Sequence, residues 1–267
     1  PPVAGIAAKR LSGKPLVVHV HATSFDRSSD NNIDTRVYDI EKRGMEAADK
    51  VITVSDLTRN IVITKYGIDP SKVVTVHNAV DFSGRSNVNV ERGVVAFLGR
   101  ITFQKGPEYF IEAAAKVLKR CDNVRFVMAG SGDMMNRSIR QVARLGISDR
   151  FHFTGFLRGK EVQEMFALSD VYVMPSVSEP FGISPLEAMR TGVPSVISKQ
   201  SGAAEVLKYA FKVDFWDVDA MADEIYALLK YPALANFASK YGFDEVNTLK
   251  WNNAAVKIKN VYESVIK

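Results

Sequence analysis

The feature that most constrains the fold is an alternation of short apolar runs with longer amphipathic stretches along the whole chain. The short runs are rich in β-branched residues and apolar throughout, which is typical of strands covered on both faces. The stretches between them have helical spacing, as at Phe110, Ala113 and Val117. This order predicts an α/β fold with parallel sheets and right-handed crossovers. The predicted strands are Leu16–Val20, Val51–Val54, Val73–Val76, Val94–Leu98, Val124–Ala129, Phe151–Thr154, Val171–Met174 and Ser195–Ile197.

A polar stretch that contains a glycine, residues 78–87, divides this pattern into two Rossmann-like units. The part after it has enough predicted strands for a doubly wound sheet, whereas the part before it has too few. We therefore expect residues 1–80 to be the back half of a Rossmann-like domain that is incomplete in this chain. Residues 81–248 are predicted to form a complete Rossmann-like domain. Residues 249–267 are predicted to be a helix, which either packs in the ordinary way or crosses back to brace the first unit.

The composition is that of a folded protein with a modest basic excess. Of the 267 residues 46% are hydrophobic, and the net charge is +5 with the basic residues interspersed. This excess fits a solvated surface or a weak attraction to phosphorylated ligands and acidic membrane surfaces. It does not fit nucleic-acid binding, because no basic stripe is interleaved with aromatic residues. The single cysteine, Cys121, and the lack of an apolar run of about 18 residues predict a cytoplasmic protein without a transmembrane segment.

The stretch from Glu179 to Ala188 carries the strongest chemical signal. It follows a predicted strand and begins a helix, where free N–H groups and the helix dipole favour a phosphate. Gly182 lets the backbone approach such a ligand closely. Ser184 is predicted to be the N-cap, with Glu187 three positions later completing a capping box. Glu187 therefore has an alternative role as the cap alone, whereas Glu179 lies in a predicted loop and has no such role.

The stretch Gly99–Pro107 is the second candidate. It follows the predicted strand Val94–Leu98 and places Arg100 and Lys105 at the carboxyl edge of the sheet, where open α/β folds bind ligands. A guanidinium and an ammonium group together can neutralise a diphosphate without a metal ion. The alternative is a pair of solvated basic side chains.

Two further stretches carry weaker signals. His19 and His21 share one face of a predicted strand, and His21 lies nearer its carboxyl end. His21 is therefore the candidate site residue, with a buried, hydrogen-bonded histidine as the alternative. No close set of Cys, His and carboxylate residues completes a metal site, so no metal is predicted. The stretch Gly130–Asp133 lacks the third glycine of a dinucleotide fingerprint and is interpreted as a turn.

Taken together and in this order, these residues resemble the family-four retaining glycosyltransferases, in the superfamily that includes glycogen synthases, sucrose synthases and mannosyltransferases. The resemblance implies a GT-B fold, in which two Rossmann-like domains face a cleft. Its most specific part is the E-x₇-E motif from Glu179 to Glu187. The supporting stretches are Gly99-Arg100…Lys105-Gly106, Asn78-Ala79-Val80-Asp81, Gly155-Phe156-Leu157 and Ser201-Gly202-Ala203-Ala204-Glu205.

The resemblance also implies a role for each matching residue. Arg100 and Lys105 would hold the donor diphosphate, and Glu187 would bond the ribose hydroxyls. Glu179 would bond the hydroxyls of the transferred sugar, with His21 beside it. The other donor-binding residues that it implies are the backbone of Gly182, Ile183 and Ser184 at the distal phosphate, Phe156 and Leu157 at the base, and Phe181 within the motif.

The activity implied is metal-independent transfer of a hexosyl group, with retention of configuration, from a UDP-, ADP- or GDP-sugar to a saccharide or other acceptor. The nucleotide sugar is then the co-substrate, and no cofactor is expected. A lipid-linked acceptor would bring the protein into peripheral contact with a membrane. Ala203 and Ala204 depart from the family, which has a second glycine there. A non-catalytic nucleotide-sugar-binding module and a nicotinamide-dependent oxidoreductase remain as alternatives.

Overall fold

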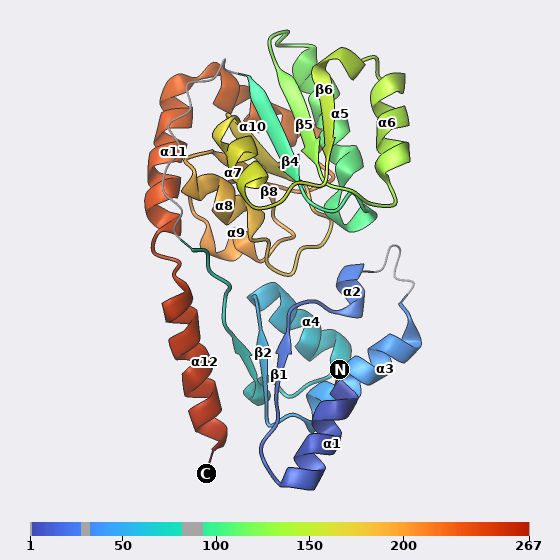
Figure 1. The fold of residues 1–267 in the computed structure, drawn as a ribbon, viewed down its shortest axis with the longest axis vertical. Helices are drawn as coiled ribbons and strands as arrows, with labels where there is room; N and C mark the ends of the chain where they lie inside the picture. The colour runs from blue at the N-terminus through green and yellow to red at the C-terminus, as the bar shows by residue number, and fades with distance from the viewer. Residues whose placement is uncertain (1, 28–32, 82–92, 267) are drawn as a thin grey trace.

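The computed structural model describes residues 2–27, 33–81 and 93–266. It shows two α/β units, one above the other (Figure 1). We call residues 2–27 and 33–81, together with the C-terminal helix, the small-sheet unit, and residues 93–246 the large-sheet unit. Positions 82–87 of the predicted linker lie outside the described residues.

Three parallel strands in the order β1-β2-β3 form the small sheet. Val17 lies opposite Lys50, and Val51 lies opposite Val73. The three strands predicted before the linker are therefore confirmed, each to within a residue. The strands are Val17–Val20 (β1), Lys50–Thr53 (β2) and Val73–Thr75 (β3), and the helices beside them are Pro2–Ser12 (α1), Ser24–Arg27 (α2), Thr35–Ala47 (α3), Asp56–Tyr66 (α4) and the 3-10 turn Pro70–Lys72 (η1).

The ends of α4 follow directly from its sequence. Ser55 is extended, and its side chain accepts a hydrogen bond from the N–H of Thr58 at 3.0 Å, as an N-cap residue does. Gly67 ends the helix with a φ of 70°, a left-handed conformation that favours glycine. Both ends of α4 are thus set by residues that directly flank it.

Six parallel strands in the order β6-β5-β4-β7-β8-β9 form the large sheet. The chain adds β5 and β6 on one side of β4, then returns and adds the other three strands on the opposite side. This confirms the predicted doubly wound sheet. The outermost strand, β9, is not predicted, because Lys212 in its middle interrupts the apolar run. The strands are Val94–Leu98 (β4), Arg125–Ala129 (β5), Phe151–Gly155 (β6), Val171–Met174 (β7), Ser195–Ser198 (β8) and Phe211–Val213 (β9).

Helices cover the large sheet on both faces (Figure 1). They are Pro107–Leu118 (α5), Met135–Arg144 (α6), Lys160–Ala167 (α7), Ser184–Arg190 (α8), Ala203–Val206 (α9), Val218–Lys230 (α10) and Pro232–Val246 (α11), with 3-10 turns at Phe103–Lys105 (η2) and Ser148–Arg150 (η3). One core contains Phe110 of α5 and Phe126 of β5, whose ring centroids lie 5.7 Å apart. A second core contains Phe166 of α7, Tyr172 of β7 and Leu186 of α8. Burial on both faces explains why these strands are apolar throughout.

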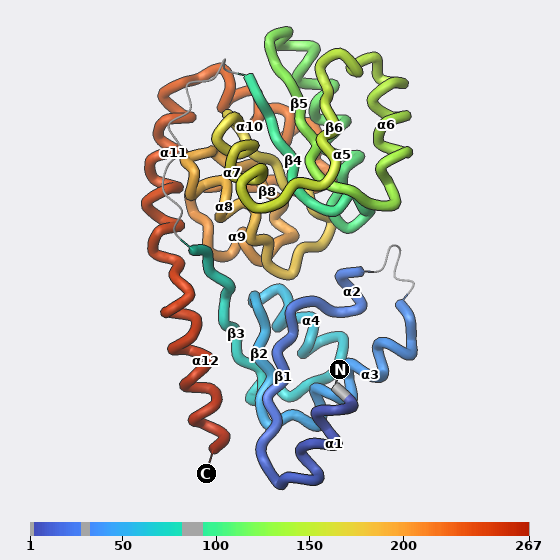
Figure 2. Tube along the Cα trace, in the orientation of Figure 1, coloured from blue at the N-terminus to red at the C-terminus, as the bar shows by residue number. Residues whose placement is uncertain are grey.

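The C-terminal helix lies along the small-sheet unit. Helix α12 (Trp251–Val265) follows α11 and runs down beside the small sheet (Figure 2). Its residue Val261 is buried in a cluster with Ile52 of β2. The hydroxyl of Tyr262 also lies 3.1 Å from Nε2 of His19 on β1. The chain thus crosses from the large-sheet unit back to the small-sheet unit.

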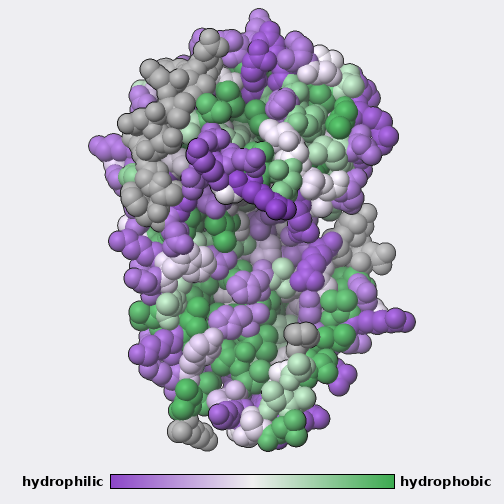
Figure 3. Space-filling view, viewed as in Figure 1, coloured by the Kyte–Doolittle hydropathy of each residue, from purple (hydrophilic) through white to green (hydrophobic). Residues whose placement is uncertain are grey.

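The two units meet at a junction with both polar and apolar contacts. Figure 3 shows hydrophilic residues, in purple, beside the hollow between the units, while hydrophobic residues, in green, gather over the small-sheet unit. Val54 and Val80 of the small-sheet unit join the second core of the large-sheet unit. Within the described part of the chain, no helix is both long and apolar enough to cross a membrane.

Candidate active site

The loops after β4 and β7 lie side by side, because these strands are neighbours where the large sheet changes direction. In open α/β sheets, ligands bind outside the carboxyl ends of the strands at such a point. The loop after β4 carries Arg100 and Lys105, and the loop after β7 carries Glu179 and Gly182. The topology thus brings together the two stretches that the sequence singles out.

Lys105 and Glu179 form an ion pair between these two loops. Their side chains are 21% and 10% exposed, so the pair is largely withdrawn from water. The backbone of Glu179 is held as well, since its N–H donates to the carbonyl of Gln200 and its carbonyl accepts from the N–H of Gly202, both at 3.0 Å. The ammonium neutralises the Glu179 carboxylate in this arrangement, and an anionic ligand beside it would share the same three N–H donors.

Arg100 has a neutral partner. Its Nη2 donates to Oε1 of Gln104 at 3.0 Å, which leaves the charge of the guanidinium available to a ligand. The neighbouring loops can approach Arg100 because they carry glycine. A Cβ on Gly130, where φ is 140°, would lie 1.8 Å from the carbonyl oxygen of Gly99. The turn at Gly130 is therefore part of the site's wall, although it lacks the dinucleotide fingerprint.

The start of α8 differs from the predicted capping box. The helix begins at Ser184, and Ile183 at the N-cap position makes no side-chain cap. The Oγ of Ser184 instead accepts a hydrogen bond from the hydroxyl of Tyr172 at 2.7 Å. Burial raises the pKa of Tyr172, which keeps this donor protonated. The predicted N-cap role of Ser184 is therefore wrong, because a buried tyrosine engages its oxygen. The helix start is left without a side-chain cap, which suits an anionic ligand.

A cavity of about 420 Å³ opens beside Arg100. Its volume and mostly apolar wall, with a few polar groups, are typical of small-molecule sites. Four predicted site residues line it, namely Arg100, Glu187, Phe156 and Leu157. Phe156 is 63% exposed, and the guanidinium carbon of Arg158 lies over its ring, 5.1 Å from the centroid.

The other predicted donor-binding residues lie outside this lining. Gly182 has a φ of 91° and is buried beside the start of α8, while Ile183 is 38% exposed there. Phe181 is only 2% exposed and packs in the second core, 6.1 Å from the ring of His77. The side chain of Phe181 is therefore withdrawn from a ligand in the cavity, and its visible role is to anchor the motif.

Glu187 and Arg190 carry opposite charges on α8, and each opposes the effect of burial on the pKa of the other. Burial raises the pKa of Glu187, and the charge of Arg190 opposes this shift. Burial lowers the pKa of Arg190, which Glu187 and Asp81 oppose. Arg190 is not among the residues predicted from the sequence, although its position three residues after Glu187 puts both on one face of the helix.

His21 and the segment after it approach the large-sheet unit. His21 is exposed and directly follows β1. The buried carboxylate of Asp26 accepts hydrogen bonds from the N–H of Thr23 at 2.7 Å and from Oγ of Ser178 at 2.8 Å. Because Ser178 precedes Glu179, the segment that follows His21 lies against the loop of the E-x₇-E motif. The sequence gives no signal for Asp26, whose partner is distant along the chain.

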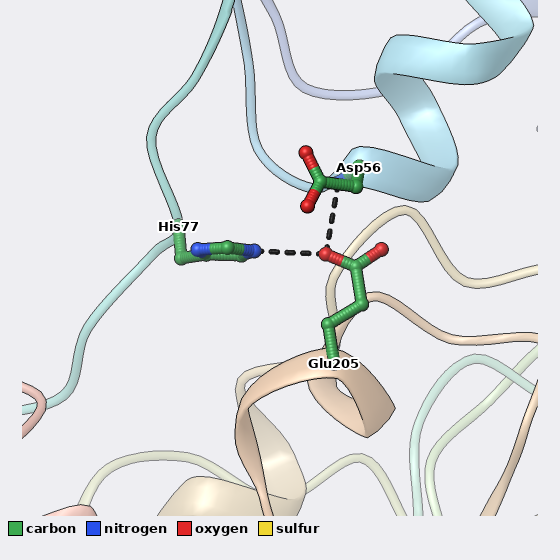
Figure 4. Close-up of side chains that lie close together, drawn as sticks. All are labelled: Asp56, His77 and Glu205. Atoms are coloured by element: carbon green, nitrogen blue, oxygen red, sulfur yellow. Dashed lines mark hydrogen bonds and ion pairs between the residues drawn. The ribbon is translucent and has the colours of Figure 1, made fainter.

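Glu205 of α9 makes a second link between the units (Figure 4). Its carboxylate accepts hydrogen bonds from the N–H groups of Asp56 at 2.8 Å and Leu57 at 2.7 Å, at the start of α4. It also lies 2.8 Å from Nε2 of His77. A carboxylate at a helix start is stabilised by the helix dipole, so this contact favours the observed approach of the two units.

The same cluster has the spacing of a metal site. Ligand atoms of Asp56, His77 and Glu205 all lie within 4.8 Å of one another. However, the Glu205 carboxylate already accepts two backbone N–H groups, and the positive end of α4 opposes a cation there. We therefore assign this cluster to the junction between the units.

Comparison with known proteins identifies the family. Residues 81–245 match the family model described as glycosyl transferases group 1, and residues 1–83 match the model Glycosyltransferase Family 4. The chain belongs to the group 1 glycosyl transferases. An uncharacterised glycosyltransferase from Methanocaldococcus jannaschii is 30% identical over 97% of this chain and 72% of its own length. The resemblance to family-four glycosyltransferases is confirmed.

Two other relatives of this glycosyltransferase have names that state an activity. The 2-deoxystreptamine N-acetyl-D-glucosaminyltransferase of Niallia circulans is 26% identical over 92% of this chain and 68% of its own length. The UDP-Gal:alpha-D-GlcNAc-diphosphoundecaprenol alpha-1,3-galactosyltransferase of Escherichia coli is 25% identical over 99% of this chain and 73% of its own length.

Solved structures of other glycosyltransferases share the fold. Sucrose-phosphate synthase from Thermosynechococcus elongatus is 21% identical, with a TM-score of 0.84 over 98% of this chain and 71% of that one. Anabaena HepE, solved with UDP and glucose, is 20% identical, with a TM-score of 0.84 over 98% of this chain and 75% of that one. The predicted GT-B fold is confirmed by these likenesses.

Proposed function

We propose that this protein is a retaining, metal-independent glycosyltransferase that moves a hexosyl group from a nucleotide-diphosphate sugar to a saccharide or other acceptor. The observation that carries the proposal is the convergence of Arg100, Lys105 and the start of α8 at one edge of the large sheet. A departing diphosphate needs positive potential that is already in place, and these three groups supply it.

The cavity beside these groups suits the nucleoside part of such a donor. The Glu187 carboxylate can accept hydrogen bonds from the two ribose hydroxyls, as the family resemblance implies. The faces of Phe156 and Leu157 offer apolar contact to a base. A diphosphate at the mouth of the cavity would then lie between the nucleoside and the sugar.

The names of related proteins support the same donor class. The Escherichia coli relative is named for UDP-galactose as donor and for a diphosphoundecaprenol-linked sugar as acceptor. HepE was solved with UDP and glucose. By likeness we extend to this chain a nucleotide-sugar donor and a saccharide or lipid-linked acceptor, the latter implying only peripheral contact with a membrane.

Retention fits departure of the diphosphate on the face where the acceptor enters. The charge of Glu179 is neutralised by Lys105, which suits a hydrogen bond to a sugar hydroxyl better than covalent attack. His21, on the opposite unit, would lie beside the donor sugar. These assignments require no metal ion, because the side chains and the helix start supply the positive charge.

The direct test is isothermal titration of UDP, ADP and GDP into the full chain, with and without EDTA. We expect at least one nucleotide to bind with an affinity that EDTA leaves unchanged. Strict dependence on a divalent cation, or no binding of any nucleotide by the folded protein, would contradict the proposal.

Retention has a separate test. An α-linked nucleotide sugar and a panel of saccharide acceptors should yield an α-linked product, as read by the anomeric coupling in proton NMR. A β-linked product would exclude retention. Binding of the donor without any transfer or hydrolysis would instead favour a nucleotide-sugar-binding module.

A further inference from the structure

Arg190 is a buried cation in the cavity that the proposed function leaves unused. It is the last residue of α8, is 8% exposed, and lines the cavity beside Glu187 and Phe166. Its Nε has no hydrogen-bond partner among the residues that the structure describes. A buried donor without an acceptor costs free energy, so this position favours a ligand that supplies one.

The charged groups around Arg190 attract its guanidinium without bonding to Nε. Glu187 and Asp81 attract the guanidinium and oppose the lowering of its pKa by burial. Neither carboxylate reaches Nε, which stays without a partner. The hydroxyl of the next residue, Thr191, donates a hydrogen bond to the carbonyl of Ala188 at 2.7 Å. Arg190 is therefore a buried side chain at this end of α8 whose Nε has no acceptor among the described residues.

The position of Arg190 along α8 corresponds to the base of a bound nucleotide. The helix start at Ser184 suits the phosphates, and Glu187 suits the ribose. Arg190 follows Glu187 by three residues, which is about 4.5 Å further along the helix. Phosphate, ribose and base follow one another in the same order in a nucleoside diphosphate. The apolar residues Leu157 and Phe166 line the same cavity.

We propose that Arg190 recognises the base by donating hydrogen bonds to a carbonyl oxygen, and that the base is uracil. This rests on the proposed function, because it requires a nucleotide in the cavity. Uracil presents a carbonyl oxygen on each of its polar edges, O2 and O4. Adenine presents no carbonyl and carries an amino group, and guanine carries one carbonyl and one amino group. Arginine has only donors, so an amino group facing it leaves two donors opposed. The donor substrate is then a UDP-sugar.

The test compares UDP, GDP and ADP by isothermal titration in the wild-type chain and in Arg190→Met. Methionine keeps an apolar stem of similar reach and removes every donor. We expect wild-type protein to bind UDP at least about tenfold more tightly than ADP, as expected when a buried polar group is left unpaired. Arg190→Met should weaken UDP about tenfold and leave ADP within about twofold, which removes the selectivity.

Thio analogues of UDP identify the contacted edge. Sulfur is a weaker acceptor than oxygen, so either 2-thio-UDP or 4-thio-UDP should bind the wild-type chain more weakly than UDP. The Arg190→Met variant should bind that analogue and UDP with equal affinity. Arg190→Lys keeps the charge but not the planar fork, so its affinity for UDP should lie between those of the wild-type chain and Arg190→Met.

A matched control is Arg144→Met, which removes an exposed arginine from α6. It should leave all three affinities unchanged. Thermal unfolding without ligand checks that Arg190→Met is folded, and if it is not, Arg190→Lys and the thio analogues provide the test. Tighter or equal binding of ADP or GDP by the wild-type chain, or equal weakening of all three nucleotides by Arg190→Met, would overturn the assignment. Failure of every nucleotide to bind would instead overturn the proposed function itself.

Discussion

Both sheets of this glycosyltransferase consist of parallel strands joined by crossover helices. Among the described residues, only the large sheet has a point where the order of strand addition reverses. The small sheet grows one way, in the order β1-β2-β3, whereas the large sheet grows both ways from β4. The change of direction puts the loops after β4 and β7 side by side, and these loops carry Arg100, Lys105 and Glu179. The small sheet has no such point within the described residues, so it offers edge groups such as His21 and the start of α4. The capacity to bind a ligand therefore follows from strand order in this protein.

The two units also differ in how they are held together. The large sheet has an apolar core on each face, with Phe126 and Leu186 fully buried in one core each. The small sheet has a smaller core around Val62 and a second cluster that depends on Val261 of α12. We therefore expect the large-sheet unit to be the more stable support, and the small-sheet unit to depend on α12 and on contacts across the junction.

The largest expected effect comes from breaking the core of the large sheet. Phe126→Ala should cost about 3–5 kcal/mol of unfolding free energy, since it leaves a cavity among packed aromatic rings. Hydrogen exchange measured by mass spectrometry should accelerate in β4 to β6 and stay unchanged in β1 to β3. Val62→Ala, in the core of the small-sheet unit, is the matched variant and should show the reverse pattern. Equal acceleration in both sheets would show that the two units unfold as one.

Removing the charge of Arg100, which lies where the strand order of the large sheet reverses, should reduce nucleotide binding without reducing the stability of the fold. Arg100→Ala should weaken UDP binding by about 1.5–3 kcal/mol, the worth of a hydrogen bond to a charged group. Because Arg100 is exposed and pairs only with neutral Gln104 among the described residues, the melting temperature should stay unchanged. Arg137→Ala, an exposed arginine on α6, is the control, and isothermal titration is the measurement. An unchanged affinity in Arg100→Ala would place the diphosphate elsewhere.

A smaller effect is expected at the junction. Glu205→Gln keeps an acceptor but loses its charge, so the bonds from Asp56 and Leu57 should weaken by about 1 kcal/mol in total. Faster exchange of these two amide protons, measured by NMR, would report the change. Asp219→Asn removes an exposed ion-pair partner of Lys116 and should leave both amide protons unaffected. Unchanged exchange in Glu205→Gln would mean that the junction does not depend on this charge.

The smallest effect is a pH dependence of the small-sheet unit. Burial, and to a lesser extent His21, lower the pKa of His19, which contacts Tyr262 of α12. The unfolded chain, with a histidine pKa of about 6.5, then binds more protons than the folded chain. The contribution of His19 to stability should therefore be fully present above a pH of about 6.5, and stability should fall slightly as the pH drops below that value. His19→Gln should flatten the decline in melting temperature, whereas His152→Gln, an exposed histidine on β6, should not. A decline of equal slope in wild-type protein and His19→Gln would remove His19 from the explanation.

Some features of the fold could be predicted from the sequence without knowing which distant residues come into contact. The strands at Val94–Leu98 and Val171–Met174 were predicted to the residue, because a strand buried on both faces requires a continuous apolar run. Ser55 and Gly67 set the ends of α4 through contacts within a few residues. The capping box at Ser184 failed for the opposite reason, since the competing hydroxyl of Tyr172 comes from β7, 12 residues away in the chain.

The sequence by itself determined the fold class, the family and the two stretches that carry the charged candidates. Local spacing and apolar runs encode these features, because each depends on residues close together in the chain. Only the tertiary structure decided that Lys105 pairs with Glu179, that Glu205 meets the start of α4 and that Arg190, with Nε unbonded among the described residues, lines the cavity. Those contacts arise from strand order and from the approach of two units, and no pattern within either partner's own segment specifies them.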